Sequence, residues 1–280
     1  MSQVSAAQVK ELRERSGVGM SKCKEALEQA NGDMEKAIEI LRKAGIAGAV
    51  KKEGREAKEG AIFYKIGSDA VSLVEVNAET DFVVKNDKFQ EFGLLMAEEV
   101  AKTKPASLEA FLQQKYSRDP ALTIEGARAL MVQLLGENIQ IKRLKFIPKT
   151  ENKSFGIYSH MGGKITCLVE LSEPAFDDLA KEVAMHIAAY NPEYIKPENI
   201  PAALVEKEKE IAKSQIVGKP EFVIEKILVG KINAFYDMVC LIRQKFVRDN
   251  TISVGDHIKK LTQSSAKPVE VLSFTRWSIG

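Results

Sequence analysis

The chain has 280 residues, of which 29% are charged and 45% apolar, and its formal net charge is +2. These proportions are those of ordinary globular proteins, so they argue against a disordered chain and a membrane protein, and the length accommodates about two or three compact units. Because the 41 basic and 39 acidic residues are interspersed, their charge attracts nucleic acid weakly and fits a protein partner better.

Three short helices are predicted in the first 45 residues. Ser5 can cap the first helix, and Gly17 is expected to end it. Ser21 begins the second helix. Asp33 caps the third, which Gly45 is expected to end.

Residues 50–60 are predicted to be a solvated linker, because they are rich in lysine, glutamate and glycine. A β-hairpin, two helices and a third strand of alternating polarity follow. We expect these elements at residues 61–66, 71–76, 88–102, 125–135 and 139–146.

The same order of elements returns in the second half of the chain. A hairpin, a helix and a distant final strand are expected at residues 154–158, 165–171, 176–190 and 271–277. We interpret this order as a duplicated unit. The copies differ after the hairpin, where the first has Glu-Thr-Asp-Phe at residues 79–82 and the second has Ser-Glu-Pro at residues 172–174.

An antiparallel helical hairpin is predicted before the last strand, at residues 204–213 and 224–238, joined by Gly-Lys-Pro at residues 218–220. Leu204 and Ile211 lie seven residues apart in the first arm, which is typical of a two-helix seam. The second arm has its own apolar side, formed by Ile224, Ile227, Leu228 and Phe235. The alternating glutamates and lysines are expected to form its solvated face.

The three cysteines, Cys23, Cys167 and Cys240, are odd in number and far apart, which favours reduced, buried thiols over a disulfide framework. With three histidines besides, no metal site and no cofactor are expected. No apolar run approaches the roughly 18 residues of a membrane-spanning helix. Residues 1–5 lack the features of a signal peptide, so we expect a cytoplasmic protein.

An acidic and aromatic tip follows the apolar strand at residues 73–77, and consists of Thr80, Asp81, Phe82 and Val83. Burying a large apolar side chain contributes about 1.5 to 3 kcal/mol. Phe82 therefore either folds back into its own core, which burial statistics favour, or inserts into a partner. Because the second copy lacks the tip, we disfavour the interpretation that the tip serves only to stabilise the fold.

Two motifs in this chain resemble those of the elongation factor Ts family, the bacterial nucleotide exchange factors for the GTPase elongation factor Tu. Residues 73–77 and 80–83 resemble the family's signature, and residues 9–33 resemble its first domain. The resemblance implies an α+β fold with a duplicated core of small antiparallel sheets and packed helices. Its four parts would be a three-helix domain similar to ubiquitin-associated domains at 1–54, core subdomains at 55–148 and at 149–197 with 241–280, and an inserted helical hairpin at 198–240.

The resemblance also implies a binding protein and not an enzyme. In the family the strand-end motif inserts between helices of the GTPase domain and displaces groups that hold Mg²⁺, so that GDP leaves and GTP can bind. Carried onto this chain, Phe82 would supply the apolar insertion and Asp81 would rearrange hydrogen bonds and charge near the metal.

Further contacts with elongation factor Tu are implied for Arg13, Met20, Lys24, Leu135, Gly136, His160, Phe246 and Val247. Residues 135–138 correspond to the family's Ile-Gly-Glu-Asn loop, and Lys245 stands where the family has a proline, which removes a conformational restraint. Taken alone, Gly136 is equally a helix C-cap, His160 an ordinary surface group and Lys24 a solvated lysine.

Two other functional classes compete with this interpretation. Glu79 and Asp81 would be the acid/base pair of an enzyme, but no cofactor motif or nucleophile elbow accompanies them. The basic residues 51–52 and 142–145 would suggest RNA binding, but they are short and mixed with acids. We therefore expect no direct nucleic-acid contact and no membrane contact. A homodimer or a two-to-two complex with the GTPase stays open.

Overall fold

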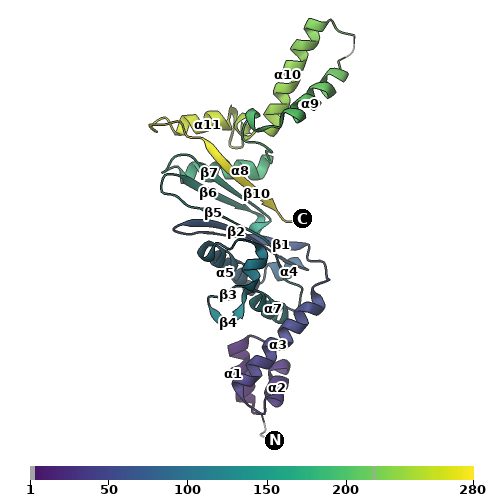
Figure 1. Ribbon diagram of the computed structural model, residues 1–280, viewed down its shortest axis with the longest axis vertical. Coiled ribbons are helices and arrows are strands. Elements are labelled where there is room, and N and C mark those ends of the chain that lie inside the picture. The colour runs from purple at the N-terminus through teal and green to yellow at the C-terminus, as the bar shows by residue number, and fades with distance from the viewer. Residues whose placement is uncertain (1–3, 217) are drawn as a thin grey trace. The chain divides into compact units, whose positions relative to one another are not determined.

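The computed structural model describes residues 4–216 and 218–280. The chain forms two compact units, the first running to Lys149 and including Ile279–Gly280, and the second comprising Thr150–Ser278. Helices at the N-terminal end and several small antiparallel sheets with packed helices make it an α+β protein, as predicted (Figure 1). Residues 1–3, on which the expectation about a signal peptide partly depends, lie outside the described residues.

Three helices begin the first unit: α1 (Ala6–Ser16), α2 (Met20–Gln29) and α3 (Met34–Lys52). The predicted caps are confirmed, because the side chains of Ser5 and Asp33 accept from backbone amides in the first turns of α1 and α3. The second helix starts at Met20, one residue before the expected Ser21. The three helices share one apolar core, which includes Leu12, Cys23, Leu27, Ala37 and Leu41.

The predicted end of the third helix at Gly45 is wrong, because α3 continues to Lys52. A Cβ atom at Gly45 would lie 2.6 Å from the side-chain oxygen of Gln133 and 3.2 Å from Leu130, both on α7 (Ile124–Leu135). The glycine therefore allows α3 and α7 to pack closely, although a glycine inside a helix costs about 0.5 to 1 kcal/mol relative to alanine. The predicted linker shortens to residues 53–58.

A three-stranded antiparallel sheet follows, with strand order β1 (Glu59–Ile66), β2 (Ala70–Ala78) and β5 (Gln140–Pro148). The predicted hairpin around residues 67–69 is confirmed, with Ile66 opposite Val71. The predicted helices are α5 (Asp87–Thr103) and α7, and α5 packs on β1 and β2. Their shared core includes Val74, Val76, Phe89, Phe92 and Ile139.

This unit also contains a short helix and a small hairpin that were not predicted from the sequence. These are α6 (Leu108–Gln113), β3 (Lys115–Tyr116) and β4 (Asp119–Thr123). The hairpin leads directly into α7, and the amide of Ile124 donates to the carbonyl of Gln114 at 3.0 Å. β3 has only two residues, and the five residues of β4, Asp-Pro-Ala-Leu-Thr, do not alternate in polarity, so neither shows the pattern that reveals longer strands.

The second unit has a sheet with order β10 (Val271–Ser278), β7 (Ile165–Leu171) and β6 (Ser154–His160), as predicted from its strands. A 3₁₀ turn, η1 (Met161–Gly163), joins β6 to β7. The helix α8 (Asp177–Tyr190) packs on β6 and β7. The order of pairing matches that of the first sheet, with the second strand of the hairpin in the centre and the distant strand beside it.

A small hairpin and a helix in the second unit repeat those of the first. They are β8 (Lys245–Phe246), β9 (Asp249–Ser253) and α11 (Val254–Leu261), and the amide of Val254 donates to the carbonyl of Gln244 at 2.9 Å. Residues 245–254 and 115–124 share the pattern Lys-aromatic-x-Arg-Asp, and their strands pair with the same spacing. This internal similarity escaped the sequence analysis.

The predicted helical hairpin consists of α9 (Ala202–Ser214) and α10 (Glu221–Val239), with 3₁₀ turns at η2 (Pro197–Asn199) and η3 (Leu241–Arg243) at its base. Ala212, Ile232 and Val239 are its buried residues within the arms, while Leu204 and Phe235 are half-buried. Ile211 is exposed, so the seam passes through its neighbour Ala212. The hairpin is therefore held by few apolar contacts.

No helix in the described part of the chain is both long and apolar enough to cross a membrane. The three cysteines are buried and form no disulfide, which confirms the expectation for them.

Candidate functional site

The predicted tip at residues 80–83 belongs to a single helical turn, α4 (Asp81–Val84), which follows the strand β2. The strand β2 ends at Ala78, and Thr80 is the N-cap of the turn. Its hydroxyl accepts a hydrogen bond from the amide of Val83 at 3.4 Å. A capping threonine followed by an aspartate favours the start of a helix, which explains why the chain leaves the sheet here.

The side chains of this turn point to opposite sides. Phe82 is 81% exposed, so the interpretation that it folds into its own core is wrong. Val84 is buried in the core of the first sheet, and Val83 is half-buried against it. The two valines thus attach the turn to the fold while Phe82 projects from it. Leaving such a ring in water forfeits about 1.5 to 3 kcal/mol.

Asp81 forms an exposed ion pair with Lys85, at 2.7 Å between Oδ2 and Nζ. The hydrogen bond with Asp81 raises the pKa of Lys85. Exposed pairs of this kind are weak and are screened by salt, so a stronger partner can separate the two side chains.

The loop at residues 135–138 lies beside the turn. Gly136 is the C-cap of α7, with φ of 83°, so the C-cap interpretation of this residue is confirmed. Leu135 is half-buried against the core. The carboxylate of Glu137 accepts hydrogen bonds from the amide and the hydroxyl of Thr80 at 3.0 and 2.6 Å. Glu137 is not among the residues predicted for the site, because no local pattern reveals a partner 57 residues earlier.

Glu79 and Asp81, the acid/base pair of the alternative enzyme interpretation, bind other groups of the fold. Glu79 accepts from the amide of Asn138 at 2.7 Å and lies 3.5 Å from Arg55, while Asp81 holds Lys85. Each carboxylate therefore already has a partner within the fold. Among residues 4–216 and 218–280, no three His, Cys, Asp or Glu side chains group to hold a metal ion.

Basic residues from both stretches that suggested RNA binding also contact groups of the fold. Arg143 and Lys142 both pair with the buried carboxylate of Glu75, at 2.6 and 3.7 Å. Lys52 donates to the carbonyl of Gly136 at 2.6 Å, and burial lowers its pKa. These cations serve the fold of the first unit, which weakens the case for an RNA-binding strip.

The three predicted residues of the N-terminal helices are exposed, and two of them, Met20 and Lys24, line the same hollow. Met20 is 43% exposed, and with Lys24 and Val9 it lines a hollow of about 420 Å³ between α1 and α2. Lys24 also lies 3.8 Å from Glu28 on its own helix. Arg13 is exposed in the last turn of α1.

In the second unit, His160 is exposed at the end of β6, and its Nδ1 lies 3.1 Å from the hydroxyl of Tyr158. The next residue, Met161, is one of the most exposed apolar residues of this unit. A hydrogen-bonding nitrogen and an apolar side chain are thus presented together at the turn between β6 and β7.

Phe246 does not present its side chain to a partner, because it is only 2% exposed. Its ring stacks on His257 with 3.9 Å between centroids, and it occupies the place in β8 that Tyr116 has in β3. Val247 is half-buried and is therefore the accessible member of the pair. Lys245, in place of the family's proline, is part of strand β8.

A buried histidine holds this hairpin, and sequence analysis missed it. His186 on α8 accepts from the amide of Val247 through Nδ1 at 3.2 Å. Its Nε2 lies 2.9 Å from the side-chain oxygen of Gln244, so the neutral ring carries its proton there. Burial lowers the pKa of His186, which agrees with a neutral ring.

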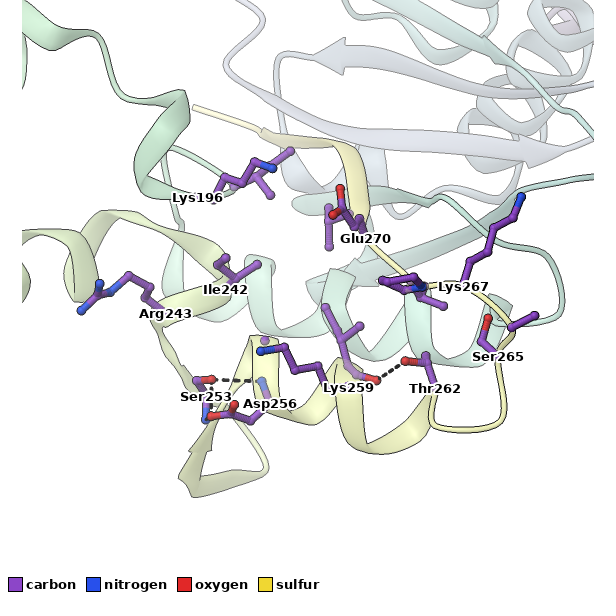
Figure 2. Close-up of a pocket in the computed structure, with 17 residues that line it drawn as sticks. Lys196, Ile242, Arg243, Ser253, Asp256, Lys259, Thr262, Ser265, Lys267 and Glu270 are labelled. Atoms are coloured by element: carbon purple, nitrogen blue, oxygen red, sulfur yellow. Dashed lines mark hydrogen bonds between the residues drawn. The ribbon is translucent and has the colours of Figure 1, made fainter.

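A separate cavity of about 550 Å³ lies in the second unit, between α11, the segment that follows it and the start of β10 (Figure 2). None of the predicted site residues lines it. Its polar groups do not converge on one point: Ser253 and Asp256 bond to each other at the start of α11, and Arg243 pairs with Asp237 outside the cavity. This arrangement assigns no ligand to the cavity.

Known proteins resemble this chain over its whole length. A family model described as Elongation factor TS matches residues 79–280. Elongation factor Ts of Protochlamydia amoebophila is 55% identical over 281 aligned residues, and those of Chlamydia caviae and Chlamydia muridarum are 44% and 42% identical, with 100% of both chains covered each time. The chain therefore belongs to the elongation factor Ts family, the nucleotide exchange factors that serve elongation factor Tu in translation elongation and that are not enzymes.

Proposed function

We propose that this chain promotes GDP release by inserting Phe82 into the GTPase domain of elongation factor Tu and thereby disturbing its Mg²⁺ site. The observation that carries the proposal is the orientation of the α4 turn. Phe82 is 81% exposed, whereas Thr80, Val83 and Val84 attach the turn to the fold. An apolar ring on a supported turn loses little entropy when it enters a gap in a partner.

The physical basis is differential binding. A GTPase holds its nucleotide largely through a phosphate loop and a Mg²⁺ ion that neutralises the phosphates. A protein that binds the empty GTPase more tightly than the loaded one must weaken nucleotide binding by the same factor. No bond is made or broken, so no general base or nucleophile is required. Asp81 contributes by exchanging Lys85 for hydrogen-bond donors of the partner near the metal.

Further contacts are proposed on both units. In the first unit, Arg13, Met20 and Lys24 dock on the partner, and Leu135 and Gly136 extend the surface beside Phe82. In the second unit, His160 and Val247 contact the partner, with Phe246 supporting Val247 from the core. Exposure supports these assignments for Arg13, Met20, Lys24, Gly136 and His160.

The finer division of the chain is proposed as well. Residues 1–54 form a domain similar to ubiquitin-associated domains, residues 55–148 and 149–197 with 241–280 form a duplicated core, and residues 198–240 form an inserted helical hairpin. The repeated order of elements and the repeated hairpins at 115–124 and 245–254 support the duplication. We propose a cytoplasmic location.

The test is release of a fluorescent GDP from elongation factor Tu, followed with and without the protein in excess unlabelled nucleotide. We expect a small amount of the protein to accelerate release manyfold in Mg²⁺ buffer. With the metal removed by a chelator, the acceleration should shrink, because part of the hold on GDP is already lost. Equal acceleration with and without Mg²⁺ would contradict the metal mechanism, and no acceleration by folded protein would contradict exchange itself.

A further inference from the structure

Two loops far apart in the sequence exchange hydrogen bonds at the base of the α4 turn. Glu137, which follows the C-cap of α7, accepts from the amide of Thr80 at 3.0 Å and from its hydroxyl at 2.6 Å. In return, Glu79 accepts from the amide of Asn138 at 2.7 Å. We name these four residues, Glu79, Thr80, Glu137 and Asn138, the cross-loop clamp.

The clamp is tied to the rest of the first unit on its other side. The side-chain amide of Asn138 donates to the carbonyl of Arg55 at 2.8 Å, and Lys52 donates to the carbonyl of Gly136 at 2.6 Å. Asn138 is buried, and Glu137 is half-buried. The loop that carries Glu137 is therefore a fixed support.

The α4 turn needs such a support. A helix of four residues is far too short to be stable alone, because the nucleation of a helix is unfavourable. The turn depends on its cap, and the hydroxyl of Thr80 serves it by accepting from the amide of Val83. The single proton of that hydroxyl is then left for Glu137.

A carboxylate suits this position better than its isosteric amide. Thr80 presents two donors, its amide and its hydroxyl, and a carboxylate offers an acceptor oxygen to each. Glutamine has one acceptor oxygen, and its amino group would face the second donor. Hydrogen bonds to a charged acceptor are also roughly twice as strong as neutral ones.

We propose that Glu137 is a positioning residue for nucleotide exchange, which fixes Thr80 and thereby holds Phe82 in the orientation that enters the partner. This inference depends on the proposed function of Phe82. Without the carboxylate, the turn samples other conformations, and the cost of ordering it falls on the step in which Phe82 inserts. Glu137 then affects the rate of GDP release more than the binding of the protein to the GTPase.

The test compares Glu137→Gln with the wild type, with Phe82→Ala as the reference for loss of insertion. The maximal rate of GDP release at saturating protein should fall about tenfold in Glu137→Gln, the usual effect of losing a hydrogen bond to a charged group. The half-saturating concentration should change less than about twofold. Partial unfolding would do the reverse, since it lowers the active concentration and leaves the maximal rate unchanged.

A charge-matched control is Glu98→Gln, because Glu98 is exposed on α5 and pairs only weakly with Arg118, at 3.6 Å. It should keep the wild-type maximal rate. In the free protein, amide hydrogen exchange of residues 79–86 should be faster in Glu137→Gln and unchanged in Glu98→Gln. The double variant with Thr80→Val should be no slower than the slower single variant, because both changes remove the same contact.

The outcomes separate the two proposals. If Phe82→Ala is slow and Glu137→Gln keeps a maximal rate within twofold of the wild type, the positioning role is wrong and the insertion stands. Losses that multiply in the double variant would mean that Thr80 and Glu137 act independently, which also overturns the positioning role. If Phe82→Ala is as fast as the wild type, the insertion itself is wrong and the role of Glu137 falls with it.

Discussion

Truncation of Phe82 to alanine is the most direct perturbation of the proposed mechanism. Full burial of a phenylalanine side chain contributes about 1.5 to 3 kcal/mol. Because 81% of Phe82 is exposed in the free protein, insertion can gain at most that share, about 1.2 to 2.4 kcal/mol. At about 1.4 kcal/mol per factor of ten, Phe82→Ala should slow GDP release about 7- to 50-fold.

The same exposure predicts a negligible effect on the fold. The ring makes little contact within its own unit, so the free energy of unfolding should change by less than about 0.5 kcal/mol. Stopped-flow release of fluorescent GDP measures the rate, and urea unfolding followed by circular dichroism measures the stability. A slow variant that is also strongly destabilised would be explained by lost structure.

Phe222→Ala is the matched control, because it makes the same truncation at a phenylalanine that is 66% exposed on α10. It should keep the wild-type rate of release. Folded Phe82→Ala protein with a wild-type rate would refute the insertion mechanism. An equal loss in Phe222→Ala would show that exposed apolar area in general, and not the α4 turn, determines the rate.

Three further predictions concern the second unit. Burial lowers the folded-state pKa of His186, so the free energy of unfolding should have its full value above pH about 6.5. Below that pH it should fall, down to the lowered pKa, by at most about 1.4 kcal/mol per pH unit. A His186→Gln protein whose free energy of unfolding falls with the same slope would contradict this. Burial raises the pKa of Cys167 to about 12 and of Cys240 to about 11, so both thiols should react with iodoacetamide only when the protein unfolds. Rapid labelling of either thiol in the folded protein, measured by mass spectrometry, would contradict this prediction. Gly156→Ala places a Cβ atom 2.1 Å from the backbone of α8 and should lower the free energy of unfolding, measured in urea, by about 1 to 3 kcal/mol. Gly230→Ala on α10 places its Cβ atom where nothing lies within 4 Å and should raise the free energy of unfolding slightly. Equal effects of the two substitutions would refute the packing argument.

Much of the local structure could be predicted because its causes are local. Ser5 and Asp33 satisfy amides of their own first helical turns, and the turn at residues 67–69 joins two largely apolar strands. The short hairpins at 115–124 and 245–254 escaped prediction because two-residue strands have no readable period.

The candidate site was also predictable only in part. The residue pattern singled out Thr80, Asp81, Phe82 and Val83, but it favoured a buried Phe82 on composition alone. The core positions beside the ring are taken by Val83 and Val84, which leaves the ring outside. Conversely, the resemblance implied a partner contact for Phe246, whose ring is buried and stacks on His257, from an element that follows it.

The sequence by itself determined the class of fold, most of the helices and strands, and the family to which the turn at residues 80–83 belongs, because these depend on neighbouring residues and on their order. Only the tertiary structure decided where the side chains point and which distant groups hold them. Gly45 lies inside a helix because α7 packs against it, and Thr80 is fixed by Glu137, 57 residues later. Contacts between residues so far apart leave no period or cap in the sequence, so they emerge only when the chain is folded.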